Sequence, residues 1–393
     1  MDLDLTDEQE RFRGVVREFA DEVVAPGAAQ RDEHEEFPLE VIGRMAALGL
    51  FGLPFPPEFG GAGADALTMC LALEELGRVD QSVGITLSAA VGLGGAMIDR
   101  FGSAAQKERW LPRVCAGEAL VSFALTEPGG GSDAAAASTR ATPVGDDGAD
   151  GSPAAWRIDG AKALITNAGT PLTALHVVTA ASEPGGGRTG LSSFLVPADA
   201  EGVTVESPYR KLGWRSSDTR GLAFTGCQVP GDALLGERGR GFAQCLDVLT
   251  DARISIAALA VGLAQACLNA SVAYAKARSA FGRPIGANQA IQTKIADMRV
   301  AVETARLATF RAAWLRDVGR PHVAEASIAK LTASEAAVAC TREAVQIHGG
   351  FGFVEEYPVA RFYRDAKVLE IGEGTSEIHR LILARDLGLP VEF

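Results

Sequence analysis

The spacing of apolar positions divides the chain into three blocks. In residues 1–120 apolar side chains recur at helical spacing between Gly/Pro-rich breakers, which predicts amphipathic helices. Residues 121–232 alternate short β-branched or apolar runs with Gly, Pro and Asp turns, as expected for antiparallel strands. Helical spacing returns in residues 233–393. We therefore expect an α+β protein in which two helical domains clasp a middle β domain.

The predicted helices and strands follow from the same pattern. Helices are expected at residues 6–24, 39–48, 66–78, 83–101, 105–115, 241–278, 288–318, 323–347 and 375–387. The strand-like runs are ALITNA, LHVVTA, SSFLVP, VTVES and GLAFTG. The low-complexity stretch 143–155 predicts a mobile hairpin loop. The most apolar long stretch, 254–275, is rich in alanine and contains polar residues, which favours a packed helix over a membrane span.

Composition and charge exclude several classes of protein. Hydrophobic residues make up 47% of the 393 residues, as in globular proteins. The net charge is -13 and Lys/Arg-dense runs are absent, which argues against binding to nucleic acid or anionic membranes. Six separated cysteines, with no C-x-x-C pair, predict neither a metal site nor a disulfide framework. Because the N-terminal residues also lack a signal-peptide pattern, we expect a cytoplasmic protein.

Two glycine-rich segments are candidate ligand sites. In the first, an apolar strand ends at Thr126 and is followed by three glycines, Ser132 and Asp133. Such glycines let backbone N–H groups face one concavity, which suits an anion or a polar heterocycle, although an ordinary tight turn explains the motif alone equally well. The second, 185–190, fits G-x-G-x-x-G but precedes a strand instead of a helix, so a plain turn is favoured.

Three further segments carry polar residues that have both functional and structural interpretations. Glu373 stands between two glycines just before a predicted helix, where the backbone can approach a ligand closely. A solvated turn acid followed by a helix cap is the alternative, and propensity alone favours it. The cationic loop 209–220 is typical of a solvated surface. Residues 278–289 join two helices, and 346–350 have the form of a glycine C-cap.

Taken in order, these segments resemble the acyl-CoA dehydrogenase family. The motifs are TEPGGGSD, LGWRSSDTRG, RSAFGRPI, QIHGGFGF and IGEGTSEIHR, and the resemblance extends to about residue 388. It implies a helical N-terminal domain (1–120), a middle antiparallel β-barrel domain (121–232) and a C-terminal four-helix bundle (233–393). It also implies FAD as cofactor, an acyl-CoA substrate, electron-transfer flavoprotein as acceptor and a homo-oligomer, usually a tetramer.

The resemblance implies oxidation of an acyl-CoA thioester to the trans-2-enoyl-CoA. Glu373 would remove the Cα proton, and a hydride would pass from Cβ to flavin N5. The Cα–H of a thioester is a weak acid, so the reaction needs a base in contact and a stabilised enolate oxygen. An apolar pocket raises the pKa of a carboxylate towards neutrality, which makes it a better base. The family's oxygen-stabilising groups are the backbone N–H of this glutamate and a ribityl hydroxyl of FAD.

The resemblance also assigns binding residues by motif. Substrate contacts would come from Ser132, Arg253 and Gly374. The flavin would be lined by Phe123, Leu125, Thr126, Ser132, Leu164 and Thr166, with Thr375 and Glu377 closing the site on the other side. The diphosphate and adenosine of FAD, held partly by a neighbouring subunit, would contact Arg278, Phe281, Gln289, Gln346 and Gly350.

Several positions differ from the family pattern. Ala252 occupies the position of an alternative base in some branches, so Glu373 is the only candidate base; Asp251 would point about 100° away on a helix. Leu164 replaces a common aromatic residue, so the family's usual electron-exit geometry does not carry over directly. Gly372 replaces a tyrosine of several straight-chain enzymes, which predicts a wider acyl cavity and a branched or bulkier substrate.

Two other functions remain open at this point. The substrate could be an acyl group tethered to a carrier protein in secondary metabolism. The chain could also be a non-catalytic flavoprotein that binds acyl-CoA as a scaffold or sensor. Loss of the base would be the simplest sign of the second alternative, and Glu373 is present.

Overall fold

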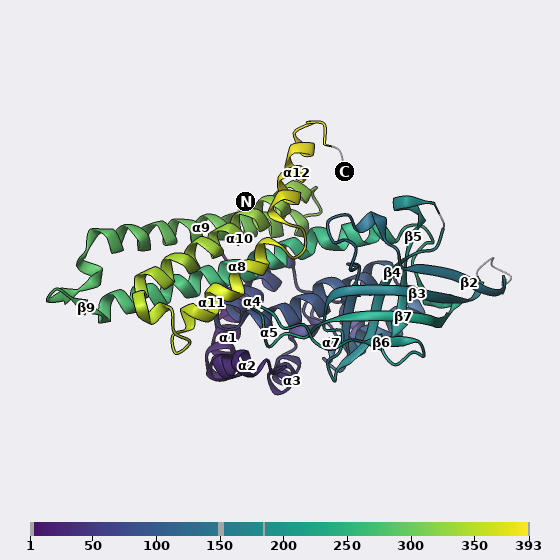
Figure 1. Ribbon diagram of the computed structural model, residues 1–393, viewed down its shortest axis with the longest axis horizontal. Coiled ribbons are helices and arrows are strands. Elements are labelled where there is room, and N and C mark those ends of the chain that lie inside the picture. Colours follow the sequence, from purple (N-terminus) through teal and green to yellow (C-terminus); the bar gives the residue numbers. More distant parts are fainter. Residues whose placement is uncertain (1–3, 148–152, 184, 392–393) are drawn as a thin grey trace.

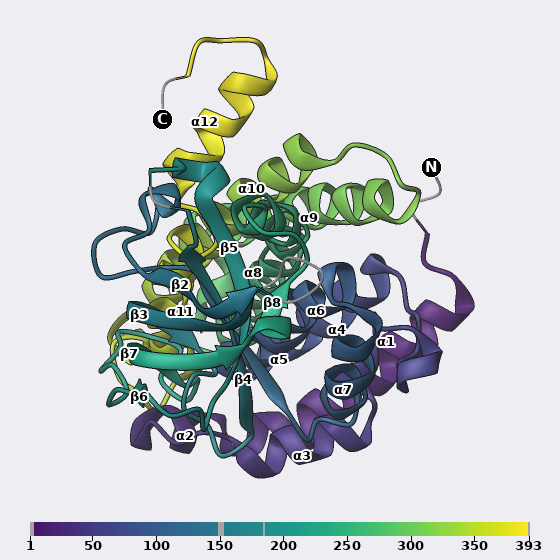
Figure 2. The ribbon, with the colours of Figure 1, turned by 90° about the vertical axis from the view of Figure 1, so that its right-hand side faces the viewer.

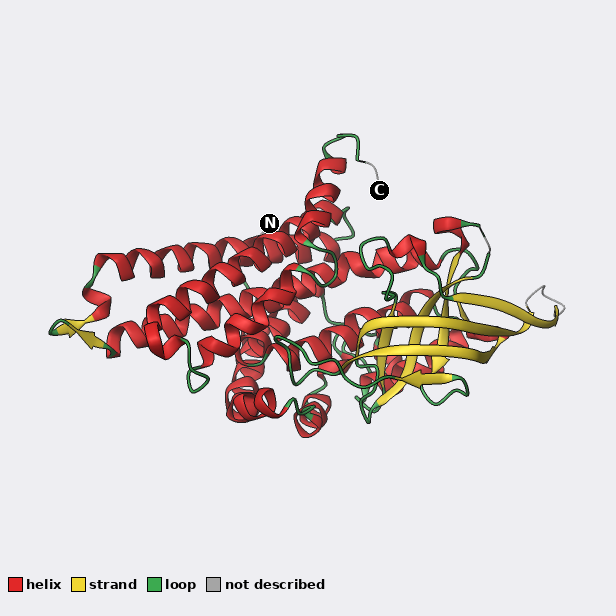
Figure 3. Cartoon of the chain, in the orientation of Figure 1, coloured by secondary structure: helices red, strands yellow, loops and turns green. Residues whose placement is uncertain are grey.

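The computed structural model describes residues 4–147, 153–183 and 185–391. Long helices form most of an elongated molecule, and a β domain lies at one end of it (Figures 1 and 3). The order along the chain is helices, strands and helices again, as the sequence predicts.

Four of the N-terminal helices, α1, α4, α5 and α7, begin at a side-chain cap. Thr6 and Ser103 each form a capping box, with Gln9 and Gln106 respectively. Two expected long helices, 6–24 and 83–101, each contain a π-helical stretch, at Ala20–Val24 and Ser88–Gly95. The seven-residue helix α2 was not predicted because its sequence AAQRDEH has no apolar stripe. The helices are α1 (Asp7–Phe19), α2 (Ala28–His34), α3 (Leu39–Ala47), α4 (Ala66–Val79), α5 (Gln81–Leu87), α6 (Ala96–Phe101) and α7 (Ala104–Cys115).

The middle domain is an eight-stranded sheet with the order β6-β7-β3-β2-β4-β5-β8, and β1 pairs with β4. The β1–β4 pair is parallel, so the sheet is mixed and not purely antiparallel as expected. Within the described residues no ladder joins β6 to β8. The strands are β1 (Leu120–Ala124), β2 (Arg140–Asp147), β3 (Pro153–Thr166), β4 (Thr173–Ala181), β5 (Leu191–Pro197), β6 (Val203–Val205), β7 (Thr219–Pro230) and β8 (Leu234–Leu235).

Two loop predictions in this domain have different outcomes. The predicted hairpin loop at 143–155 is too long, because β2 and β3 remain paired out to Asp147 and Pro153. Its centre, 148–152, lies outside the described residues. The G-x-G-x-x-G segment ends in a 3₁₀ turn, Gly187–Gly190, that leads directly into β5, so the prediction of a plain turn is confirmed.

Three long helices form the C-terminal block. They are α8 (Gly241–Ala277), α9 (Gln289–Asp317) and α10 (Val323–His348), and α11 (Pro358–Ala366) and α12 (Ser376–Asp386) pack against α10. A small hairpin of β9 (Ser279–Ala280) and β10 (Arg283–Pro284) joins α8 to α9 at the far end of the bundle (Figure 1). The nine-residue helix α11 was not predicted. The end of α12 projects away from the body (Figure 2).

The two helical blocks share one hydrophobic core, and the sheet has a second core of its own. Helix α8 packs directly on α4, and the contact is closest at Gly262, where a Cβ would lie 2.2 Å from the Glu74 carbonyl oxygen. The blocks therefore pack directly against each other, and strands β1, β4 and β5 contribute Val121, Val177 and Leu195 to the same core. Two helical stretches, Gln81–Phe101 and Gly241–Ala277, are long and apolar enough to cross a membrane, but their most apolar windows are 89% and 72% buried inside the protein. All six cysteines are buried free thiols.

Candidate active site

Glu373 lies in the turn that leads into α12. Its φ is 55° and that of Gly374 is 103°, so two successive residues adopt the left-handed region. Non-glycine residues rarely adopt this conformation, and strain of this kind is concentrated at functional sites. The Thr375 hydroxyl accepts a hydrogen bond from the Ile378 N–H at 3.3 Å and caps α12, as the structural interpretation of the segment predicted.

The side chain of Glu373 is only partly exposed, so it is not a freely solvated turn acid. Its Oε2 atom is buried and has no hydrogen-bond partner among the described residues. Burial raises the pKa of Glu373 to about 7, against the opposing effect of the positive charges of Lys330 and Arg253. Lys330, on α10, is fully buried, and Arg253, on α8, is buried as well. A carboxylate with a pKa near neutrality is well matched to general base catalysis.

A free backbone donor accompanies the base. In the part of the chain that the structure describes, the Glu373 N–H donates no hydrogen bond. A backbone N–H held beside a base can stabilise the oxygen on which negative charge develops during proton abstraction. One residue of the turn therefore presents both a carboxylate of raised pKa and an unpartnered backbone N–H.

On α8, the surroundings of Asp251 and Ala252 indicate structural roles for both residues. The Asp251 carboxylate accepts hydrogen bonds from His322 Nε2 at 2.7 Å and from Arg316 Nε at 3.0 Å, and it also pairs with Arg100. Its oxygens are thus occupied, in agreement with its interpretation as a structural residue. Ala252 lines a small cavity of about 80 Å³ between α4, the π-helical stretch Ser88–Gly95 and α8.

The first glycine-rich segment is joined to β3. The Thr126 carbonyl oxygen accepts a hydrogen bond from the Ala163 N–H at 3.0 Å, which brings the TEPGGGSD loop beside ALITNA. Within the loop, Glu127 accepts hydrogen bonds from the buried Lys162 Nζ at 2.8 Å and from the Ser138 N–H at 2.7 Å. Although burial raises the pKa of Glu127, these hydrogen bonds lower it to about 2. The loop is therefore anchored by a buried ion pair.

The face formed by this loop and β3 fits a flat heterocycle. Leu164 is 63% exposed and has a φ of 59°, so a strained apolar side chain points outwards. The Thr126 and Thr166 hydroxyls are partly exposed, and neither has a partner within the described ranges. No atom lies within 4 Å of a Cβ built on Gly129, so the loop is open. An apolar surface flanked by hydroxyl and backbone donors suits the isoalloxazine of FAD.

The other residues predicted to line this face differ in their exposure. Phe123 is partly exposed and Ser132 is exposed, so both side chains are accessible. The Leu125 side chain is buried in the core, and its carbonyl accepts a hydrogen bond from Lys162 Nζ at 3.1 Å, so only its backbone could contact a cofactor. Glu377 is exposed on the first turn of α12.

The residues predicted for the diphosphate and adenosine lie at the opposite end of the molecule from the β domain, near the β9–β10 hairpin (Figure 1). A single chain therefore does not bring the two predicted halves of the FAD site together. All of these residues are exposed, and Phe281 is 100% exposed: Arg278, Phe281, Gln289, Gln346 and Gly350.

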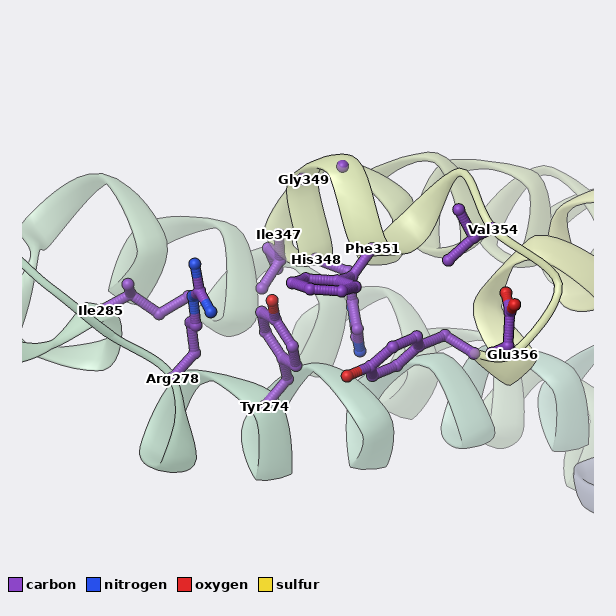
Figure 4. Close-up of a pocket in the computed structure, with 11 residues that line it drawn as sticks. Tyr274, Arg278, Ile285, Ile347, His348, Gly349, Phe351, Val354 and Glu356 are labelled. Carbon is purple, nitrogen blue, oxygen red and sulfur yellow. The ribbon is translucent and has the colours of Figure 1, made fainter.

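An open groove of about 750 Å³ lies at this end of the bundle (Figure 4). The Arg278 guanidinium lies over the Phe351 ring, 5.6 Å from its centroid. The Tyr274 and His348 rings stack at 4.2 Å. A cation beside flat aromatic rings fits a diphosphate joined to an adenine.

Sequence reasoning missed two buried residues beside Glu373. Lys330 lies in the helical sequence SIAKL, where no motif distinguishes it from a surface lysine. His379 is fully buried, and its ring lies against the backbone of Glu373 and Gly374. No sequence pattern shows that either residue packs behind the base, because their contacts depend on how α10 and α12 meet.

Comparisons with known families match three domains in order. The family models are acyl-CoA dehydrogenase N-terminal domain over residues 6–118, middle domain over 122–227 and C-terminal domain over 239–388. The chain is 46% identical to "Probable acyl-CoA dehydrogenase YngJ" of Bacillus subtilis, covering 98% of this chain and 100% of the relative. It is 43% identical to the mitochondrial "Short-chain specific acyl-CoA dehydrogenase" of Mus musculus, covering 98% and 91%.

The chain is also similar to solved structures over almost its whole length. The butyryl-CoA dehydrogenase of Megasphaera elsdenii is 38% identical with a TM-score of 0.93, covering 98% of this chain and 100% of that one. A chain in a structure reported as "Electron transferring flavoprotein of Acidaminococcus fermentans" is 37% identical with a TM-score of 0.94, covering 98% and 99%. The "Prolyl Acyl Carrier Protein Oxidase AnaB" is 31% identical with a TM-score of 0.93, covering 98% and 100%.

Proposed function

Because this chain belongs to the acyl-CoA dehydrogenase family, we propose that it converts an acyl-CoA thioester to the trans-2-enoyl-CoA, with Glu373 as the base and FAD as cofactor. Its relatives are oxidoreductases, and it is an enzyme of that class. The observation that carries the proposal is the buried Oε2 atom of Glu373, which has no hydrogen-bond partner among the described residues, beside the unpartnered backbone N–H of the same residue.

In the proposed reaction, the side chain and the backbone N–H of Glu373 have separate roles. Glu373 takes the proton from the carbon next to the thioester carbonyl. Its backbone N–H donates to the carbonyl oxygen while negative charge develops there. The strained left-handed turn fixes both groups in advance, so that little reorganisation is needed during the reaction.

The open face beside Leu164 supports FAD as the cofactor. Thr126 and Thr166 would hydrogen-bond the flavin, and Phe123 and Leu164 would line it. When bound, FAD supplies the acceptor for the hydride that leaves Cβ. Arg278 and the aromatic groove would hold the diphosphate and adenosine ends. Because these groups lie at opposite ends of one chain, we propose that a second copy completes each FAD site and that the enzyme is a homo-oligomer, with a tetramer as the family's usual assembly.

The surroundings of Gly372 support a substrate wider than a straight chain. A Cβ built on Gly372 meets only the Val368 carbonyl oxygen, at 3.5 Å, so the space beside the base is open. We propose a short acyl group that is branched or bulkier near the reacting carbons. The substitution Gly372→Tyr should fill this space and raise the preference for straight over branched short acyl-CoAs. An unchanged preference would contradict the proposal.

Electron-transfer flavoprotein is the proposed electron acceptor, and the similarity to a chain in a structure reported under that name supports it. Leu164 would form part of the surface next to the flavin, so the acceptor would meet an aliphatic side chain at this position. Reduction of an added electron-transfer flavoprotein by the acyl-CoA-reduced enzyme would test the assignment.

A second function differs in the carrier of the acyl group. The similarity to a prolyl acyl-carrier-protein oxidase favours considering a carrier-tethered substrate. The two functions share the base and the flavin, so the discriminating comparison is flavin reduction by acyl-CoA against the same acyl group on a carrier protein. Faster reduction by the carrier-bound group would select this second function.

The direct test of the base is the variant Glu373→Gln. It should retain FAD and lose flavin reduction by substrate under anaerobic conditions, because the amide cannot accept the proton. Glu370→Gln is the matched control, since Glu370 lies in the same segment and pairs with Lys367 at 2.6 Å. Reduction retained by Glu373→Gln would refute Glu373 as the base.

A further inference from the structure

A buried cation lies directly behind the turn that carries Glu373. Lys330 is 0% exposed, and its Nζ donates a hydrogen bond to the Gly374 carbonyl oxygen at 2.6 Å. Within the described residues no carboxylate lies close enough to form a salt bridge with it. An ammonium buried with only a carbonyl partner is costly for stability, because its lost hydration is only partly replaced.

The turn is held from two sides. Lys330 reaches it from α10, and His379 packs against it from α12. A Cβ built on Gly374 would lie 3.2 Å from His379 Nε2, so the ring sits close against the glycine. Burial lowers the pKa of His379 to about 3, and it is therefore a neutral packing group. Because Lys330 and His379 both contact Gly374, they also set the position of the adjacent Glu373 carboxylate.

The charges around Glu373 come from each element packed against it. Lys330 on α10 and Arg253 on α8 are the cations that favour the ionised carboxylate. His379 on α12 is neutral, and Glu370 and Glu377 act on Lys330 from the flanking segments. Among the described residues, the buried Nε of Arg253 has no hydrogen-bond partner, and neither Arg253 nor Lys330 forms a salt bridge. Together they offset the cost of ionising a carboxylate in an apolar site.

We propose that Lys330 is a positioning residue for Glu373. Its hydrogen bond to Gly374 fixes the left-handed turn, and its buried charge keeps the Glu373 carboxylate ionised. This inference rests on the proposed function, because it takes Glu373 as the base. Lys330 contacts neither the substrate nor the cofactor in this account. It acts through the conformation and the protonation of a neighbouring residue.

The test is the pH dependence of flavin reduction in Lys330→Met. Loss of the nearby positive charge should move the midpoint of the rate up by about one pH unit, which lowers the rate roughly tenfold below the midpoint. Loss of the hydrogen bond to Gly374 should leave part of the deficit in place at about pH 9. Lys330→Arg keeps the charge and should retain the wild-type midpoint. Ser334→Ala is the matched control, since Ser334 is buried one turn further along α10 and donates to the Lys330 carbonyl at 2.8 Å.

A second readout does not depend on turnover. In substrate-free enzyme, the infrared band of the protonated Glu373 carboxyl, identified by its absence in Glu373→Gln, should titrate at a higher pH in Lys330→Met. If that variant does not retain FAD, Lys330→Gln, which is neutral but can donate, serves the same comparison. An unchanged midpoint with a rate lowered equally at every pH would overturn the proposal. Activity in Glu373→Gln would instead refute the proposed function itself.

Discussion

At the scale of single residues, Glu127 shows how strongly the flavin-side loop is anchored. The carboxylate is 7% exposed and accepts hydrogen bonds from Lys162, Ser138 and Thr139. Its folded pKa of about 2 lies below the usual pKa of glutamate, about 4.3, so the ionised form is favoured by folding. The stabilisation is therefore fully present above about pH 4.3 and is lost as the pH falls towards 2.

This linkage predicts a pH-dependent cost of Glu127→Gln. The variant should lose about 3 kcal/mol of unfolding free energy at pH 7, from a pKa shift of about two units, and the difference should shrink as the pH falls from about 4.3 to 2. The variant should also bind FAD more weakly, because Thr126 directly precedes Glu127 and would shift once the loop is no longer anchored. Denaturation in urea across this pH range measures the first effect. A cost that stays constant with pH would contradict the ion-pair account.

Glu373 illustrates what sequence could and could not predict at this scale. Its place between two glycines marks a close approach of the backbone, but propensity favoured a solvated turn. Oε2 is buried, and the two cations that act on the carboxylate, Arg253 on α8 and Lys330 on α10, are each more than 40 residues away in the chain. The helix cap at Thr375 is local, and for that reason it was predictable from the sequence.

At the scale of elements, Asp80 determines where α4 ends and α5 begins. Its Oδ1 accepts a hydrogen bond from the Ser82 N–H at 3.0 Å, and its Oδ2 pairs with Arg31 at 2.9 Å. The residue is 2% exposed, so both interactions are shielded from water. The side chain thus combines an N-cap with a buried ion pair that connects α2 to the core helices.

We therefore predict that Asp80→Ala destabilises the protein by about 3 kcal/mol, combining the loss of a cap with an unpaired buried arginine. Asp21→Ala is the control, because Asp21 also pairs with an arginine, Arg78, but its side chain is 50% exposed. That variant should cost less than about 1 kcal/mol. Urea denaturation followed by far-ultraviolet circular dichroism compares the two. Equal costs would show that burial is not what makes Asp80 important.

The elements that sequence predicted are those with a long apolar period. Helices 241–278 and 288–318 match α8 and α9 within a residue at each end. The short helix α2 was missed because its sequence has no apolar stripe, whereas α11 was missed although α3, which has the same nine-residue length, was predicted. The strand β2 was missed because its composition suggests a loop, and pairing with β3 overrides that preference.

At the scale of the whole molecule, the separation of the two predicted FAD half-sites is the main feature. The Leu164 face belongs to the β domain, and Arg278 lies at the far end of the bundle (Figure 1). The order of motifs predicted the parts of the site, but the distance between them could be known only from the fold. Each half is exposed in a single chain, which is what an assembly of identical copies would require.

A mixing experiment tests whether the site is shared. Leu164→Glu and Arg278→Glu should each abolish FAD retention as pure proteins, because each damages one half of every site. Oligomers assembled from both variants should contain some undamaged composite sites, about a quarter of the total for random pairing. FAD content after co-refolding or co-expression is the measurement. No recovery in the mixed protein would mean that each chain builds its own site.

The central claim is that acyl-CoA reduces a flavin held by this protein, with Glu373 removing the proton. The most direct measurement is the visible absorbance of the FAD-loaded enzyme during anaerobic titration with straight-chain, branched and aryl acyl-CoAs. The account predicts rapid bleaching by a short branched or bulky acyl-CoA in the wild-type protein and none in Glu373→Gln. With FAD demonstrably bound, failure of every acyl-CoA to bleach the wild-type flavin would contradict it.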